Sequence, residues 1–201
     1  MSFLEHFAEL GIICRAAKLE DVVQLVAERP ERLVTALENA CYCGRLDIVE
    51  RMWGVLSRVE VLHENNRLSQ VACMHGHMKV AQWLWTANNG QLDKQRLFHT
   101  ACEYGHLHIA QWLWDIAASE INPHAEGDKA FRYACVNGCL DVAQWLWAIA
   151  PGIKPPAQCD ETFVWTWGRR QLDVCDWLAT LSPTLVTWLR VPRWSRAKLW
   201  L

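Results

Sequence analysis

Apolar positions in the middle of the chain follow the spacing of two successive helices. Phe98, Ala101 and Cys102 fall at i, i+3 and i+4, which places one large and two small apolar side chains on one helical face. Gly105 follows, and glycine readily adopts the left-handed conformation that ends a helix. A second apolar stripe then continues at Leu107, Ala110, Leu113 and Trp114. The pattern therefore predicts a helix, a tight turn and a second helix.

The same helical pair returns along the chain. The phrase Ala-Gln-Trp-Leu-Trp occurs three times, beginning at Ala81, Ala110 and Ala143. The cysteine of the pattern recurs at intervals of 32, 29 and 33 residues, at Cys41, Cys73, Cys102 and Cys135. A period of about 20 to 50 residues is typical of a stacked solenoid, in which each unit packs on its neighbours. We therefore expect an all-α helical-repeat solenoid of about five helix–turn–helix units with helical caps.

Three sets of equivalent positions, which we call columns, predict how the units pack. Large residues share one column, at Phe98, Phe131 and Phe163. Small residues share another, at Ala40, Ala72, Ala101 and Ala134. The turn column holds Gly44, Gly76, Gly105 and Gly138. Small side chains allow adjacent helices to approach closely, and large ones fill the wider spaces between them.

The two ends of the array depart from the repeat. Phe3, Phe7 and Leu10 line one face of a predicted N-terminal capping helix, so the predicted solenoid domain spans residues 1–185. Near the other end Trp167 replaces the repeated cysteine, and an indole there would block a further unit. Residues 186–201 mix basic and aromatic side chains. We expect this segment to cap the last unit; the alternative is contact with an anionic surface, either membrane or nucleic acid.

One stretch of the repeat carries a family resemblance. Phe98-His99-Thr100-Ala101-Cys102-Glu103-Tyr104-Gly105-His106-Leu107 matches the Leu-His-x-Ala-Ala-x-x-Gly-His-Leu core of ankyrin repeats nearly residue for residue. The chain resembles the ankyrin-repeat family over roughly residues 12–180. Its Trp-Leu-Trp helices are similar in style to the divergent arrays of large DNA viruses of amoebae.

The resemblance is incomplete between the units. The chain lacks Thr-Pro before the histidine position and Gly-Ala-Asp-Val-Asn between units. The β-hairpin fingers of the family are therefore expected to be absent or reduced, with plain loops in their place. We expect Asn66, Asp128 and Asp160 to be the N-caps of the helices that follow these loops.

Nine cysteines and eight histidines raise the question of a metal or redox site. Cysteines of one column lie one per unit, about 8 to 10 Å apart, which is too far for a disulfide or a shared zinc ion. We interpret them as small buried apolar residues. Two local clusters, Cys73-x-His75-x-His77 and Cys135-x-x-x-Cys139, lack a second pair at ligand spacing. Catalytic motifs are missing as well, so we expect no metal, no cofactor and no enzyme activity.

Charge and hydropathy narrow the classes of partner. The chain has 20 Lys and Arg against 22 Asp and Glu, a net charge of −2, so nothing indicates a nucleic-acid partner. No uncharged apolar run reaches the ~18 residues of a membrane span. The first residues lack the basic and apolar regions of a signal peptide. These features predict a cytoplasmic protein in a reducing compartment.

Tryptophan is over-represented, with 13 residues. One column holds Trp53, Trp85, Trp114 and Trp147. The other, two residues earlier in each helix, holds Trp83, Trp112, Trp145 and Trp177. Residues two apart on a helix point about 200° apart. We therefore expect the first column to pack between units and the second to be half exposed, either lying flat over its neighbours or forming a contact strip.

The resemblance implies a protein-binding module without a small-molecule substrate. In the family, partners contact variable residues on the first helices, typically the two positions before the turn glycine. These positions differ from unit to unit here while their neighbours repeat. The predicted binding residues are Tyr42, Met74, His75, Glu103, Tyr104, Val136 and Asn137.

The identity of the partner and the oligomeric state stay open. The viral style of the array implies that the partner is a host protein. One alternative is subunit assembly through the tryptophan strip and the basic C-terminal segment. Another is an adaptor role in ubiquitin transfer, for which Ser182-Pro183-Thr184-Leu185 is a poor match to the C-terminal box of some viral ankyrin proteins.

Overall fold

The computed structural model describes residues 18–56, 62–153 and 161–181. The predicted capping helix near Phe3, the N-cap at Asp160 and the segment 186–201 lie outside the described residues. The described part contains no strand. Its helices are α2 (Leu19–Glu28), the 3-10 helix η1 (Pro30–Arg32), α3 (Leu33–Cys43), α4 (Leu46–Leu56), α5 (Leu62–Met74), α6 (Met78–Ala87), α7 (Lys94–Glu103), α8 (Leu107–Ala117), α9 (Ala125–Val136), α10 (Leu140–Ile149), α11 (Glu161–Gly168) and α12 (Leu172–Leu181).

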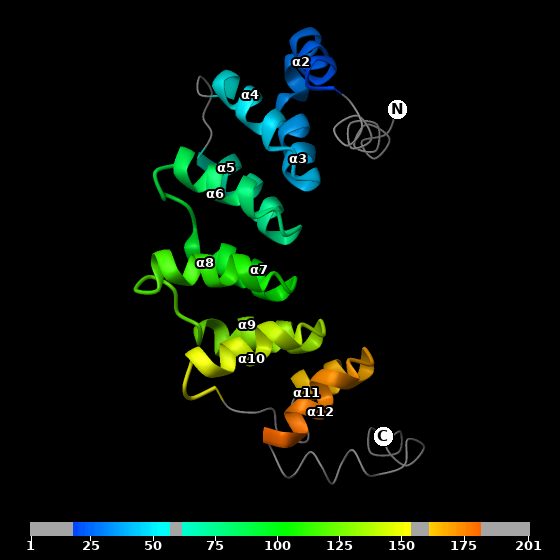
Figure 1. Ribbon diagram of the computed structural model, residues 1–201, viewed down its shortest axis with the longest axis vertical. Helices are drawn as coiled ribbons and strands as arrows, with labels where there is room; N and C mark the ends of the chain where they lie inside the picture. The colour runs from blue at the N-terminus through cyan, green and yellow to red at the C-terminus, as the bar shows by residue number, and fades with distance from the viewer. Residues whose placement is uncertain (1–17, 57–61, 154–160, 182–201) are drawn as a thin grey trace.

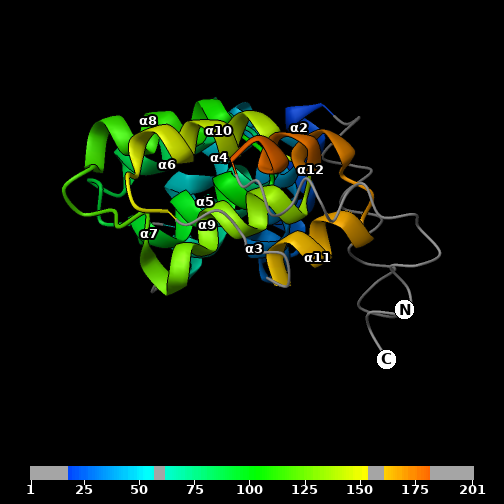
Figure 2. The same ribbon diagram turned by 90° about the horizontal axis from the view of Figure 1, so that it is seen from below.

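Ten of these helices form five helix–turn–helix units, stacked along the long axis of the molecule (Figure 1). The first helices of the units are α3, α5, α7, α9 and α11, and the second helices are α4, α6, α8, α10 and α12. They form two layers, which Figure 2 shows end-on. The loops between units lie at the left of Figure 1 and the tight turns at the right. The prediction of an all-α solenoid of about five units is confirmed.

The first helices pack closely because small residues line their contacts. Each contacts the next, from α3 to α11. The alanine column and the cysteine column lie in these contacts and are fully buried, at Ala40, Cys41, Ala72, Cys73, Ala101, Cys102, Ala134 and Cys135. Large side chains there would force the helix axes apart. The small-residue columns therefore set the spacing of the stack.

The second helices stand further apart, and tryptophan fills the space between them. At each junction an indole of one unit packs edge-to-face against an indole of the next. The pairs are Trp53–Trp83, Trp85–Trp112, Trp114–Trp145 and Trp147–Trp177, with ring centroids 5.4, 5.9, 6.5 and 6.4 Å apart. All eight indoles are half-buried. The column of Trp53 packs between units and the column of Trp83 is half exposed, as expected, but each pair takes one member from each column, so both columns pack between units.

Phenylalanines of the first helices complete two of these junctions. Phe98 contacts both Trp114 and Trp145, with ring centroids 6.0 Å away in each case. Phe131 contacts Trp147 and Trp177 in the same way, at 6.1 and 6.2 Å. Each phenylalanine is almost completely buried. The aromatic residues thus connect the two layers at the junctions that follow α7–α8 and α9–α10.

The turn glycines adopt the left-handed conformation, with φ between 71° and 80° at Gly44, Gly76, Gly105 and Gly138. Their missing Cβ also makes room for the following unit. The side chain that lies over each glycine comes from the residue just after the next position of the turn column, and these residues are His77, His106, Cys139 and Gln171. We call this arrangement the turn contact. In the fifth unit Arg170 stands in the glycine column, with φ 63°.

Two of the predicted N-caps do not cap their helices. Asn66 lies inside α5, and its side-chain oxygen accepts a hydrogen bond from the backbone N–H of Asp93 at 2.8 Å. Asp128 lies in a left-handed stretch within α9, and its carboxylate is 2.7 Å from Nδ1 of His124. Asp93 is the N-cap of α7, and its side chain accepts a hydrogen bond from the backbone N–H of Arg96.

The cysteines of the described part are thiols, without disulfides. Burial raises the pKa of the Cys73 thiol to about 12 and moves the pKa values of Cys41, Cys102 and Cys135 in the same direction. Within the described ranges, no three His, Cys, Asp or Glu side chains are grouped to hold a metal ion. The helices of these ranges are too short or too polar to cross a membrane.

Candidate functional site

The predicted binding residues all lie at the ends of first helices, next to the turn glycines. Tyr42 is near the end of α3 and Met74 ends α5. Glu103 ends α7 and Val136 ends α9, while His75, Tyr104 and Asn137 come directly after their helices. Because the units stack in register, these residues follow one edge of the molecule. The structure divides them into two groups.

The first group, in units one and two, is held in aromatic and turn contacts. The rings of Tyr42 and His75 lie 4.2 Å apart. Nε2 of His77 is 2.8 Å from the backbone oxygen of Tyr42, and Nε2 of His106 is 2.8 Å from that of Met74. These two histidines therefore bond the preceding unit. Burial, together with the neighbouring His77 and His106, lowers the pKa of His75.

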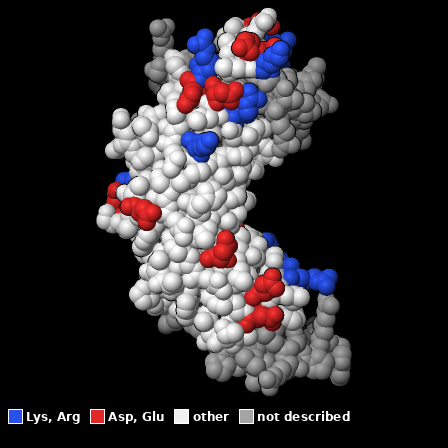
Figure 3. All heavy atoms as spheres, viewed as in Figure 1, with Lys and Arg blue, Asp and Glu red and all other residues white. Residues whose placement is uncertain are grey.

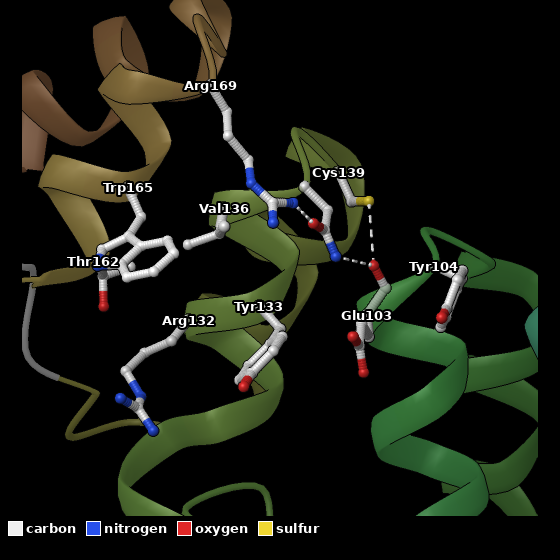
Figure 4. A pocket seen from close by; sticks show the side chains of 10 residues that line it. Glu103, Tyr104, Arg132, Tyr133, Val136, Cys139, Thr162, Trp165 and Arg169 are labelled. Carbon is white, nitrogen blue, oxygen red and sulfur yellow. Dashed lines mark hydrogen bonds between the residues drawn. The ribbon is translucent and has the colours of Figure 1, made fainter.

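The second group lines a groove of about 700 Å³ at the ends of α7, α9 and α11. Four predicted residues belong to it: Glu103, Tyr104, Val136 and Asn137. Figure 4 shows the groove from close by. The sequence reasoning missed the remaining residues of the lining, which are Arg132, Tyr133, Cys139, Thr162, Trp165 and Arg169.

Exposed aromatic side chains give this groove its character. Tyr104 is 47% exposed, Tyr133 41% and Trp165 58%, so a large part of each ring faces solvent. Tyr133 lies on α9 and Trp165 on α11, and Tyr104 comes directly after α7. Large aromatic side chains are usually buried, and a cluster of them on a surface marks a contact site. The groove therefore offers an apolar surface that runs across three units.

Tyr133 and Trp165 could have been found from the sequence. They share the column five residues before the turn glycine, whose other members are Asn39, Val71 and Thr100. In each unit, the residue of this column comes three and four residues before the two predicted binding positions. A helix therefore places it on the same face as those positions. It also varies between units. Extending the search for variable positions by one helical turn would have included both aromatic residues.

Asn137 connects three units and is not an unconstrained surface residue. Its amide Nδ2 donates a hydrogen bond to the backbone oxygen of Glu103 at 2.8 Å. Its Oδ1 accepts one from Nη1 of Arg169 at 2.5 Å. Cys139 lies on the same carbonyl of Glu103, with Sγ 3.8 Å away. Asn137 therefore helps to align α7, α9 and α11.

Positive charge borders the apolar surface. In Figure 4 the indole of Trp165 lies between the guanidinium groups of Arg132 and Arg169. Glu103 lies on the far side of α9, beside Tyr133. Figure 3 shows one face of the whole stack, on which charged side chains gather over the N-terminal helices and at the lower right, and few lie over the middle. The groove thus combines aromatic rings with two cations and one carboxylate.

Comparison with known proteins agrees with this architecture. The family model for ankyrin repeats, in three copies, matches residues 68–158. Residues 68–158 are ankyrin repeats. The match begins within α5, includes the Glu103 and Asn137 regions of the groove and ends before α11. The unit α11–α12 continues the same stack and supplies Trp165 and Arg169. No curated protein matches the chain in a sequence search.

Proposed function

We propose that this ankyrin-repeat protein binds a protein partner through the groove between α7, α9 and α11. Ankyrin repeats are generally protein-interaction modules. The observation that carries the proposal is the exposure of Tyr104, Tyr133 and Trp165 along one groove. Tyrosine and tryptophan are enriched among the residues that dominate binding energy, because each buries a large apolar area with few rotatable bonds.

The rigidity of the groove also supports binding. Asn137 and Cys139 fix the first-helix ends of units three and four relative to each other, and Arg169 extends the connection to unit five. A surface that is already ordered loses little conformational entropy when a partner docks. The similarity in style to viral arrays leads us to propose a host protein as that partner.

Site-specific photo-crosslinking tests the proposal in the cell. A photoreactive phenylalanine analogue is placed at Tyr104, at Tyr133 or, as the matched control, at Ile116. Ile116 on α8 is 44% exposed, close to the value for Tyr133, but lies on a second helix outside the groove. We expect a discrete protein adduct from positions 104 and 133 and none from 116. Adducts at 116 alone, or at no position, would refute the proposed binding face.

The alternative of subunit assembly loses its main support in the structure. It relied on a strip of tryptophans available to other subunits, and Trp83, Trp112, Trp145 and Trp177 each pack against an indole of the preceding unit. Light scattering over a range of protein concentrations separates the two roles. A mass that stays at that of one chain favours the binding module, and a rising mass favours assembly.

A further inference from the structure

Building on the proposed function, we infer that the groove recognises a protein segment in which a carboxylate side chain lies next to an aromatic or aliphatic one. The carboxylate would bind Arg132 or Arg169, which lie on either side of Trp165, and the apolar side chain would pack on Trp165 and Val136. This inference names the chemistry of the partner, which the family match does not supply. It rests on the charge state and bonding of the two arginines.

Four basic side chains elsewhere in the stack pair with carboxylates. Arg45 pairs with Asp47 at 2.6 Å, Arg67 with Glu38 at 2.7 Å and Lys129 with Glu126 at 2.7 Å. Lys94 also pairs with Glu120. These contacts neutralise the positive charge locally, so the corresponding surfaces have little attraction for an anion.

The two arginines of the groove are bonded differently. Nη1 of Arg169 donates to the amide oxygen of Asn137, and Nη2 of Arg132 donates to the backbone oxygen of Glu126 at 3.1 Å. Both acceptors are neutral, and neither guanidinium forms an ion pair with a carboxylate of the described residues. A guanidinium carries five N–H donors, so each arginine keeps donors for a further acceptor. The pKa of the Glu126 carboxyl is lowered chiefly by Lys129 and also by Arg132, but no carboxylate of the described residues lies within ion-pair distance of either arginine of the groove.

Arg132 supplies a second observation that points to a ligand. Its Nε is buried, yet it has no hydrogen-bond acceptor among the described residues. A buried N–H without an acceptor costs free energy, about 1 to 3 kcal/mol, and that cost is removed when the side chain turns toward an acceptor in the groove. Arginine and carboxylate bind through parallel, charge-assisted hydrogen bonds, which match the geometry of the guanidinium edge. A carboxylate is therefore the acceptor that suits this position best.

Trp165 determines what must accompany the carboxylate. Its indole is 58% exposed and lies between the two guanidinium groups, with Val136 beside it (Figure 4). An acidic side chain alone would leave this apolar surface in water. A neighbouring aromatic or aliphatic side chain covers the indole and excludes water from the ion pair, which strengthens it. The groove thus favours an acidic and an apolar residue close together in one segment.

Two other anionic or internal ligands fit less well. A nucleic-acid strand would bring repeated phosphates across the groove, and the carboxylate of Glu103 on the far side of α9 would repel them. The chain's own C-terminal residues contain Arg190, Arg193 and Arg196, which have the same charge as Arg132 and Arg169. Charge complementarity therefore selects an acidic segment of another protein.

A phage-displayed library of random linear peptides provides the test. Selection on the full-length chain is expected to enrich peptides with Asp or Glu close to Trp, Phe or Leu. The most enriched peptide is then synthesised with a fluorescent label and titrated by anisotropy. We expect Arg132→Gln with Arg169→Gln to weaken its binding at least about tenfold, since the charge-assisted contact is lost at either arginine, and Trp165→Ala to have an effect of similar size.

The controls separate partner chemistry from the binding face. Arg96→Gln removes an exposed arginine of α7 outside the groove and should leave the affinity unchanged. The charge-reversed chain, with Arg132→Glu and Arg169→Glu, should prefer the peptide whose acidic residues are replaced by lysine. Circular dichroism of each variant shows that the fold is retained.

Each contrary outcome overturns a different statement. Peptides that lose affinity in Trp165→Ala but lack acidic residues would refute the carboxylate and leave the proposed function standing. Peptides whose affinity Trp165→Ala does not change would refute the groove as the binding face and with it the proposed function. Failure to enrich any peptide counts against both. Tight binding of a single-stranded oligonucleotide, abolished in the double glutamine variant, would replace the acidic segment by nucleic acid.

Discussion

A Cβ atom added at Gly76 would lie 2.7 Å from the imidazole ring of His106. That position has φ 76°, where side chains other than glycine are strained. The His106 ring lies there because its Nε2 is bonded to the backbone oxygen of Met74. One glycine thus satisfies two independent constraints, the conformation of its own turn and the approach of the following unit.

Gly76→Ala should therefore lower the free energy of unfolding by about 2 to 3 kcal/mol, from backbone strain and a displaced hydrogen bond. Gly54→Ala is the matched control, because Gly54 lies within α4 and an added Cβ would meet nothing within 4 Å. That change should stabilise the helix by about 0.5 to 1 kcal/mol. Urea denaturation of the two variants gives both values. Equal effects would contradict the proposed turn contact.

Two histidines make stability depend on pH. The pKa of His75 is lowered by burial and by its neighbours His77 and His106. The pKa of His99 is lowered chiefly by burial, which outweighs the opposite effect of Glu126. The folded state therefore binds fewer protons than the unfolded state just below the usual histidine pKa of 6.5. Stability contributed by the neutral rings is present above that pH and is lost as the pH falls toward the lowered folded values.

We expect the free energy of unfolding to fall as the pH is lowered from 7 through 6.5, and to fall less steeply in the double variant His75→Gln, His99→Gln. Chemical denaturation at a series of pH values measures both slopes. An unchanged slope in the double variant would show that these rings do not carry the pH dependence.

At the scale of elements, the two layers solve different packing problems. First helices approach closely over alanine and cysteine, whereas second helices are separated by paired indoles. The Trp114–Trp145 pair is edge-to-face, with an interplanar angle of 89°, and both rings also contact Phe98. Such pairs contribute free energy beyond the apolar area that they bury. The rings should therefore be coupled energetically across each junction.

A double-mutant cycle measures this coupling. Trp114→Ala and Trp145→Ala should each cost about 2 to 4 kcal/mol, and their combined cost should fall short of the sum by about 1 kcal/mol. Trp53 and Trp145 share no ring contact, so the same cycle on that pair should be additive. A coupling that is no larger for Trp114 with Trp145 than for the control pair would contradict the edge-to-face junction.

Repetition explains which elements could be predicted. A residue that recurs in every unit has the same neighbours each time, so the glycine, alanine and phenylalanine columns correctly indicated turns, close contacts and core. The N-caps were harder to predict, because the loops between units differ in length. Asn66, for example, accepts a hydrogen bond from the loop before α7 and does not cap its own helix. The pairing of indoles from two different columns depends on how one unit is rotated on the next, and no single unit contains that information.

At the scale of the whole molecule, the five units form a linear stack whose two ends differ. Each interior unit is covered on both sides, whereas the fifth unit has Arg170 in place of the turn glycine. In such a row, stability is approximately a sum of terms for each unit and each junction. Units near the ends should therefore open before those in the middle.

The order in which the units open can be measured through buried cysteines, since Cys41, Cys102 and Cys175 lie in units one, three and five. Burial raises their thiol pKa values, that of Cys175 to about 11, so reaction with a thiol reagent requires local opening. Pulse labelling in increasing urea, read by mass spectrometry, should modify Cys41 and Cys175 at lower urea concentrations than Cys102. Simultaneous labelling of all three would show that the stack unfolds as a single unit.

The groove also belongs to this scale, which is why the sequence revealed only part of it. The rule for variable positions led to Glu103, Tyr104 and Val136, and all three line the groove. It could not show that Tyr42 and His75 pack against each other, nor that Trp165 and Arg169 of the last unit complete the lining. A groove requires neighbouring units at a known angle, and that angle arises from the small and large columns together.

The turn contact has a consequence for how such a chain can change over time. Because the same pair of surfaces forms every internal joint, recombination between two repeats of one gene can delete or duplicate a whole unit and leave each new joint complete. His106, for example, could rest on Gly44 as it now rests on Gly76. A copy added after the fifth unit would instead meet the side chain of Arg170. Length can therefore vary from within the array but not by addition beyond its last turn.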